Sequence, residues 1–183
     1  NMIEGMPCGI LHSTHFFNAM SRLHHRNPGA VGAILIHPEM KCEIICDGFH
    51  VHHELIRMLL RSKPLSNIVM ITDALKPTGM KGDNLTANVV SCIFNGAFVS
   101  KEDPSLLLGS GLTLLKAVQN MVSWEVPVEQ AVIMSSTNPA RIYSFAKTGS
   151  LIPEYRADIV VFDKDFNLKG LFIGGDLVRD HFA

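Results

Sequence analysis

Residues 43–73 read EIICDGFHVHHELIRMLLRSKPLSNIVMITD and contain two short apolar runs around one helical pattern. The runs, residues 43–46 and 67–72, are rich in branched side chains and end at turn-forming residues, as short strands do. Between them, residues 53–62 repeat leucine and isoleucine at helical spacing, and Lys63-Pro64 ends that pattern. This order of strand, helix and strand predicts parallel strands joined by a helix, which is the unit of α/β folds.

The residues before this unit predict a further strand and a short helix. Residues 9–14 form an apolar run that ends in Thr14-His15, and residues 30–36 are the one helical candidate between there and residue 40. The first part of the chain therefore predicts β/α units of the kind that build a (β/α)8 barrel.

The pattern changes after Asp73. Residues 76–88 are expected to form a loop, and residues 89–94 and 97–100 flank Asn95-Gly96, which is a strong hairpin signal. We expect helices at residues 112–124, 128–135 and 139–145, with Asn138 as the N-cap of the last one. The end of the chain predicts strands at residues 157–162, 168–173 and 176–179, the last two joined by Gly174-Gly175.

The predicted architecture is an α/β fold with a small appendage. Residues 1–148 would be about three β/α units of a TIM-type barrel, with a hairpin inserted at about residues 85–100. Residues 149–183 would form strands of a small β-sandwich domain.

Composition excludes several classes of protein. The chain has 183 residues, is 47% hydrophobic and has a mean hydropathy of +0.22, so it can form a core. Its 16 basic and 17 acidic residues nearly cancel, which argues against a nucleic-acid binder. Its apolar runs are too short for a membrane span, and residues 1–9 do not resemble a signal peptide. We therefore expect a cytoplasmic protein whose cysteines (Cys8, Cys42, Cys46 and Cys92) are buried and reduced.

Polar side chains follow the predicted strands. His15, His50 and Asp73 come at or just after strand ends, and in β/α barrels that face carries the active site. A neutral imidazole can bind a metal that acidifies water, and a carboxylate can take the proton. The alternative is structural, because histidines near strand ends and aspartates after strands often satisfy local hydrogen bonds. The basic cluster His24-His25-Arg26 is either a solvated loop or an anion site.

Longer strings are more specific than this spacing. THFFNAM (residues 14–20) with HHRNPG (residues 24–29) resembles the sixth-strand motif of the N-acetylglucosamine-6-phosphate deacetylases, which belong to the amidohydrolase superfamily. IICDGFHVH (residues 44–52) and TDA (residues 72–74) resemble the seventh-strand and eighth-strand motifs. The similarity continues in order through LGSGLT, NPAR and GSL to ADIVVFD at residues 157–163.

The resemblance implies a role for each matching residue. His15 would be a metal ligand, His50 would contact the substrate near the acetamide carbonyl, and Asp73 would be the general base that later protonates the amine. The substrate contacts would be Asn18 and Ala19 on the sugar and phosphate, Arg26 on the phosphate, and Leu114 beside the acetyl group, where many relatives have methionine.

The resemblance also implies cofactors and partners. It implies a divalent metal, zinc or similar, in the full-length protein, an amino-sugar phosphate as substrate, and a homodimer without nucleic acid or membrane partners. Family members are much longer, and their first metal ligands precede the region that matches this chain. We therefore expect the whole protein to be the deacetylase and the 183-residue chain alone to be inactive, with metal weakly bound or absent.

Two other functions remain open from the sequence. The chain could be a non-catalytic fragment that associates with itself through exposed strand edges. It could also belong to another amidohydrolase, such as a dihydroorotase-like enzyme or a nucleobase deaminase.

Overall fold

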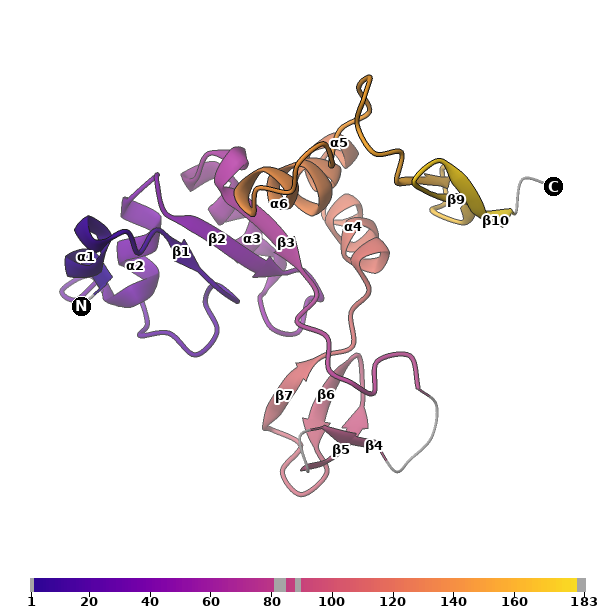
Figure 1. The fold of residues 1–183 in the computed structure, drawn as a ribbon. Coiled ribbons are helices and arrows are strands. Elements are labelled where there is room, and N and C mark those ends of the chain that lie inside the picture. The colour runs from indigo at the N-terminus through magenta and orange to yellow at the C-terminus, as the bar shows by residue number, and fades with distance from the viewer. Residues whose placement is uncertain (1, 81–84, 88–89, 181–183) are drawn as a thin grey trace.

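The computed structural model describes residues 2–80, 85–87 and 90–180 (Figure 1). It contains a three-stranded sheet β1-β2-β3, a four-stranded sheet β4-β5-β6-β7 and a three-stranded sheet β10-β9-β8. Figure 1 shows helices gathered around the first sheet, the second sheet below it, and the third at the far end of the chain. The predicted α/β class is confirmed.

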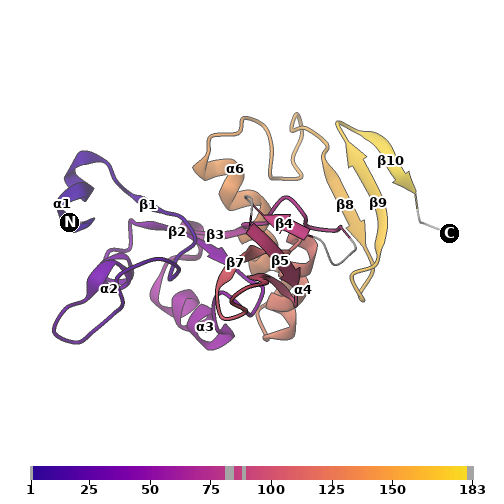
Figure 2. The same cartoon turned by 90° about the horizontal axis from the view of Figure 1, so that it is seen from below.

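The first sheet is parallel, as predicted. It consists of β1 (His12–Ser13), β2 (Lys41–Ile45) and β3 (Ile68–Ile71), with α2 (Gly29–Ile36) and α3 (His53–Ser62) as the intervening helices. In Figure 2, α2 and α3 lie on one side of this sheet and α6 lies toward the other. β1 is shorter than the predicted run 9–14, because only His12 and Ser13 pair with β2. The chain before it forms the short helices α1 (Met2–Gly5) and η1 (Met6–Cys8).

The main core lies between the parallel sheet and the helices. Cys42 and Ile44 of β2 are fully buried there, while Glu43 between them points to the opposite face because strand side chains alternate. The other large, fully buried members include Phe16, Ile34, Met40, Ile56, Leu59, Ile68, Met121 and Met134.

Local signals set the ends of the first helices. The His52 ring accepts a hydrogen bond from the backbone N–H of Glu54 at the start of α3, 3.3 Å away. The residue four positions after Ile34 is Pro38, which has no N–H to donate to the Ile34 carbonyl of α2. The buried Lys63 ammonium group donates to that carbonyl instead, at 2.9 Å. Lys63 also donates to the His37 carbonyl at 2.6 Å, so one ammonium group closes the end of α2.

The predicted hairpin is part of a larger antiparallel sheet. β5 (Val90–Phe94) and β6 (Ala97–Ser100) flank Asn95-Gly96 as expected, and Gly96 has φ +89°. Two flanking strands, β4 (Leu85–Ala87) and β7 (Leu107–Ser110), were not predicted. β4 lies in the predicted loop 76–88. Residues 81–84 and 88 of that loop, and Val89 of the predicted strand 89–94, are outside the described residues.

The closing helices differ from the prediction in their boundaries. α4 is Leu114–Ser123, with Thr113 as N-cap, since its hydroxyl accepts from the Lys116 N–H. α5 (Val128–Val132), the π-helix η3 (Ile133–Thr137) and α6 (Asn138–Ile142) follow one another without a break. Asn138 is therefore not a cap: its side chain is buried and donates to the carbonyls of Leu65, in the 3-10 helix η2 (Leu65–Asn67), and Ile68 at 2.7 and 2.8 Å.

The last strands are close to those predicted. β8 (Ile159–Phe162), β9 (Leu168–Ile173) and β10 (Asp176–Asp180) form one antiparallel sheet, with Gly174-Gly175 turning the chain between β9 and β10. Through residue 180 this is a single layer, whereas a sandwich needs two sheets.

Two further expectations concern cysteines and membranes. Cys42, Cys46 and Cys92 are buried free thiols as predicted, but Cys8 is exposed because it ends η1 at the surface. Burial raises the pKa of Cys42 and Cys46, so these thiols remain protonated at neutral pH. Within the described part of the chain, no helix has the length and apolarity needed to cross a membrane.

Candidate active site

The predicted site residues follow neighbouring strands. Because β1, β2 and β3 are parallel and adjacent, their carboxyl ends meet at one edge of the sheet. His15 follows β1, His50 follows β2 and Asp73 follows β3. The structure thus brings the loops that carry these three residues to the same edge.

The His15 loop is held by its own hydrogen bonds. His15 Nδ1 lies 3.1 Å from the Asn18 carbonyl, so Nδ1 carries the hydrogen and Nε2 is left as the ligand atom. The Asn18 amide donates back to the carbonyls of His15 and Phe16 at 3.2 and 3.3 Å. His15, Phe17 and Ala19 have φ of +31°, +79° and +53°, a region that costs energy for residues with a Cβ.

The described residues do not form a metal centre on their own. A catalytic zinc site uses three protein ligands. Across residues 2–80, 85–87 and 90–180, no group of 3 or more His, Cys, Asp or Glu side chains is placed to hold a metal ion. His15 can therefore supply a single ligand, and the metal that the family resemblance implies does not fit this chain alone.

His50 is held by Asp47 in the loop after β2. The Asp47 carboxylate accepts from His50 Nδ1 at 2.6 Å, and its other oxygen accepts from the backbone N–H groups of Phe49 and His50 at 2.8 and 2.9 Å. Both side chains are buried, with 3% of Asp47 and 7% of His50 exposed. Burial acts to raise the pKa of Asp47, but these hydrogen bonds outweigh it and lower that pKa, so Asp47 is ionised at neutral pH.

Asp73 is held through its backbone. Its side chain is exposed and its φ is +48°. The Ser110 N–H donates to the Asp73 carbonyl at 3.2 Å, and the Leu75 N–H donates to the Ser110 carbonyl at 2.9 Å. β7 of the inserted sheet therefore fixes the peptide that presents the Asp73 carboxylate.

The basic cluster is exposed. His24 and Asn27 exchange backbone hydrogen bonds of 3.1 and 3.0 Å, which makes a tight turn around His25 and Arg26. The Arg26 guanidinium donates to His25 Nε2 at 3.1 Å. Its remaining N–H groups are in a position to bind an anion such as a phosphate.

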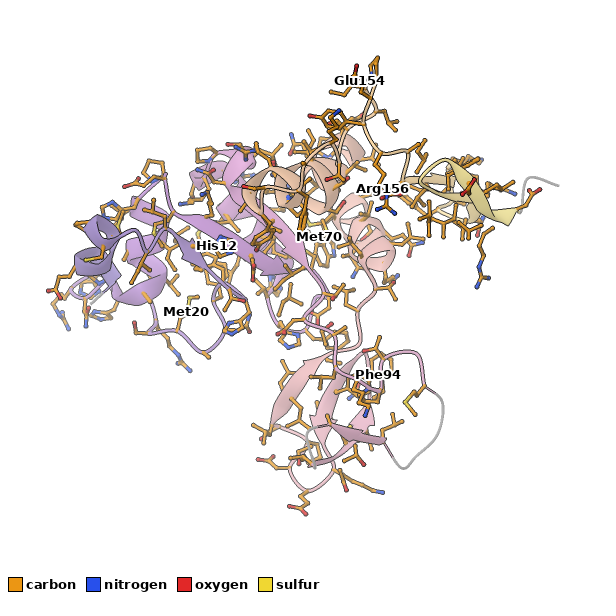
Figure 3. The ribbon with its side chains drawn as sticks, in the orientation of Figure 1. His12, Met20, Met70, Phe94, Glu154 and Arg156 are labelled. Carbon is orange, nitrogen blue, oxygen red and sulfur yellow. The ribbon has the colours of Figure 1, made fainter. Side chains whose placement is uncertain are left out.

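Leu114 is the predicted substrate contact that follows Thr113 at the start of α4. It lines a groove of about 650 Å³ between α4, η3 and β8, with Arg156 at the same groove. Figure 3 places Arg156 between the helices and the terminal sheet. His15, His50 and Asp73 are not among the residues that line this groove.

Sequence reasoning missed two positioning groups. The apolar pattern indicates Asp47 only as a turn residue, although its spacing of three residues from His50 is typical of a side chain that reaches back along a turn. Ser110 has no local signal, because its pairing with the peptide of Asp73 joins residues far apart in the sequence.

Comparison with known proteins identifies the family of this chain. The model of the amidohydrolase family matches residues 1–178. The N-acetylglucosamine-6-phosphate deacetylase of Vibrio furnissii is 38% identical over 177 residues, which are 96% of this chain and 44% of the relative. A putative N-acetylgalactosamine-6-phosphate deacetylase of Escherichia coli (strain K12) is 35% identical over 165 residues, 89% of this chain and 98% of the relative.

A solved structure shows the same fold. The crystal structure of N-acetylglucosamine-6-phosphate deacetylase from Thermotoga maritima has a TM-score of 0.89 and 28% identity, and the match covers 97% of this chain and 49% of that one. This chain thus spans about half the length of that relative and less than half of the Vibrio one. The chain belongs to the amidohydrolase family, and it resembles the C-terminal portion of its N-acetylglucosamine-6-phosphate deacetylases.

Proposed function

We propose that this chain is part of an enzyme that hydrolyses N-acetylglucosamine 6-phosphate to glucosamine 6-phosphate and acetate. The observation that carries the proposal is the common edge: in a chain of the amidohydrolase family, His15, His50 and Asp73 follow three adjacent parallel strands. In this proposal those strands are three of the eight in a barrel, and β8–β10 belong to a β-sandwich.

The proposed chemistry is amide hydrolysis. The exposed Asp73 carboxylate takes a proton from water as the water oxygen attacks the acetamide carbon, and it returns the proton to nitrogen as the C–N bond breaks. His50 contacts the acyl oxygen, on which negative charge develops. Of the described residues, only His15 is proposed as a metal ligand, so zinc or a similar ion would need further ligands that they do not supply.

The substrate class follows from the outer residues. Arg26 would bind the phosphate, and Asn18 and Ala19 would contact the sugar and phosphate. Relatives include deacetylases named for both N-acetylglucosamine and N-acetylgalactosamine 6-phosphates, so the epimer at C4 is the nearest alternative substrate. We also propose a cytoplasmic homodimer.

The test uses the whole protein that contains this chain. Acetate release should be measured with both sugar phosphates. As controls, hydrolysis of dihydroorotate should be followed by the formation of carbamoyl aspartate, and deamination of a nucleobase by the release of ammonia. We expect hydrolysis of N-acetylglucosamine 6-phosphate, and a loss of about 10²–10⁴-fold in kcat for Asp73→Asn. Turnover of a control substrate alone, or an unchanged kcat in Asp73→Asn, would contradict the proposal. The 183-residue chain alone should show no turnover.

A second candidate is a fragment that associates with itself. Its supporting observation is exposed apolar surface: Leu151 is 79% exposed and Phe145 is 62% exposed. β1, β3, β8 and β10 are edge strands of their sheets, and such edges can pair with another chain.

A further inference from the structure

Asp47 makes its hydrogen bonds within one short loop. One carboxylate oxygen holds the backbone N–H groups of Phe49 and His50, and the other holds the His50 ring. Both partners of the ring contact are buried, so the contact is short and shielded from water. The two oxygens thus act separately, since one shapes the loop and the other holds the imidazole.

The chemistry of a carboxylate decides which ring nitrogen carries the hydrogen. An ionised carboxylate only accepts hydrogen bonds, so Nδ1 of His50 must be the N–H donor. In the neutral ring Nε2 then carries no hydrogen and can only accept, whereas in the doubly protonated ring Nε2 also carries a hydrogen and can donate. The remaining form, a neutral ring with its hydrogen on Nε2, would place two acceptors 2.6 Å apart.

The other ring nitrogen is available to a ligand. Within the described part of the chain, Nε2 of His50 makes no hydrogen bond, and every buried side-chain nitrogen or oxygen there has a partner. Nε2 is therefore at an accessible surface, although only 7% of the side chain is exposed. The buried side of the ring faces Asp47 and the accessible atom faces away from it.

We propose that Asp47 is a positioning residue that holds the His50 ring with Nε2 toward the substrate and excludes the neutral Nε2–H form. This inference rests on the proposed function for its catalytic consequence. If His50 donates a hydrogen bond to the acyl oxygen, it does so as an imidazolium whose charge is balanced by Asp47. Asp47 itself does not touch the substrate.

The first test reads the ring directly. Nitrogen-15 NMR of histidine-labelled chain distinguishes the Nδ1–H and Nε2–H forms of a neutral imidazole. The wild-type His50 signal should show a hydrogen on Nδ1, either as the neutral Nδ1–H ring or as the doubly protonated imidazolium. In Asp47→Asn, the amide oxygen can keep the two backbone bonds while the amide N–H₂ faces Nδ1, so the hydrogen should move to Nε2.

A matched control is available in a second aspartate turn. Asp163 accepts backbone hydrogen bonds from Asp165 and Asn167, both at 2.9 Å, and holds no histidine. Asp163→Asn should leave the His50 signal unchanged. A wild-type ring in the Nε2–H form would overturn the inference without any variant, and so would the same ring form in wild type and Asp47→Asn.

The second test separates positioning from simple stability. In the whole protein, Asp47→Asn should lower kcat about 10-fold to 100-fold with little change in KM, and it should have no further effect in a His50→Gln background. Additive losses in the double variant would overturn the inference. If the wild-type protein does not deacetylate, the proposed function fails, while the NMR result still decides the role of Asp47.

Discussion

Several residues that follow the parallel strands have a strained backbone. His15, Ala19 and Asp73 all have positive φ although each has a Cβ, a conformation that costs about 1–3 kcal/mol per residue. Hydrogen bonds from Asn18 hold the first loop, and pairing with Ser110 holds the last. Such strain is typical of functional loops, because the fold must hold side chains where the chain alone would not place them.

Arg26 offers a direct test of phosphate recognition. Arg26→Ala removes an exposed guanidinium but no buried contact, so folding should be unaffected. In the whole protein, KM for the sugar phosphate should rise by at least about 10-fold, because a bidentate charged contact is lost. Steady-state kinetics with the unphosphorylated sugar provide the control, and equal effects on both substrates would contradict the phosphate role.

Lys63 tests the end of α2. Lys63→Met keeps the aliphatic stem but leaves the Ile34 carbonyl without a donor, since residue 38 is proline. The free energy of unfolding should fall by about 1–3 kcal/mol, the cost of an unsatisfied buried acceptor. Urea denaturation followed by circular dichroism measures this. Lys116→Met, at an exposed position on α4, should change stability by less than about 0.5 kcal/mol.

Helices whose ends are set by neighbouring residues could be predicted from the sequence. α3 has the predicted bounds, because its apolar spacing, the preceding His52 and the following Lys63-Pro64 are all local. β4 and β7 could not be predicted, because each strand exists only by pairing with β5 or β6. Asn138 illustrates the same limit: the Asn-Pro pair is typical of a helix start, yet its amide is used to hold residues 65 and 68.

The candidate site shows this division too. His15, His50 and Asp73 could be placed at strand ends because turn residues follow apolar runs. Whether their side chains meet a common substrate stays a prediction. Of the groups that hold them, Asp47 has a local signal in its spacing from His50, whereas Ser110 is evident only in the folded chain because it pairs with a peptide far away in the sequence.

A polar network links α6 to the strands. Glu43 accepts from the Tyr143 hydroxyl, from Thr14 at 2.6 Å and from His12 at 3.0 Å. Figure 3 labels His12 on β1. Burial acts to raise the pKa of Glu43, but these donors outweigh it and lower that pKa, while burial and Glu43 raise the pKa of Tyr143 to about 12.

Tyr143→Phe should weaken this link. The expected loss is about 1 kcal/mol at neutral pH, reduced from the value for a buried charged acceptor because Tyr143 is partly exposed. Since the pKa of Glu43 is lowered in the folded chain, its stabilisation is present above the ordinary value of 4.5 and lost as pH falls below it. The difference between wild type and variant should therefore shrink in acid.

Tyr155→Phe provides the control for this experiment. Tyr155 is exposed, and its hydroxyl makes no hydrogen bond within the described residues. Unfolding free energies of both variants should be compared from about pH 3 to pH 7, across the ordinary glutamate pKa. A Tyr143→Phe difference that is independent of pH would contradict the role given to Glu43.

On the scale of the whole molecule, the terminal sheet exposes apolar side chains. Val160 of β8 and Val178 of β10 are 52% and 54% exposed. Light scattering after size exclusion should give a mass above 20.1 kDa that rises with concentration. Val160→Lys with Val178→Lys should lower that mass, while Leu106→Lys, in the loop between β6 and β7, should not. A dilute, stable monomer would contradict self-association.

The insertion that carries β4–β7 begins at Ala74 and ends at Ser110, and these two residues form a β-bridge with each other beside the parallel sheet. Its own small core, which includes Leu85, Cys92 and Phe98, is distinct from the main one. Because the two ends of the insertion lie side by side, a change in its length or its replacement in a homologue adds little loop-closure entropy to the folding of the parallel sheet. Evolution can therefore treat it as a replaceable module, provided that each replacement restores the bridge beside Asp73.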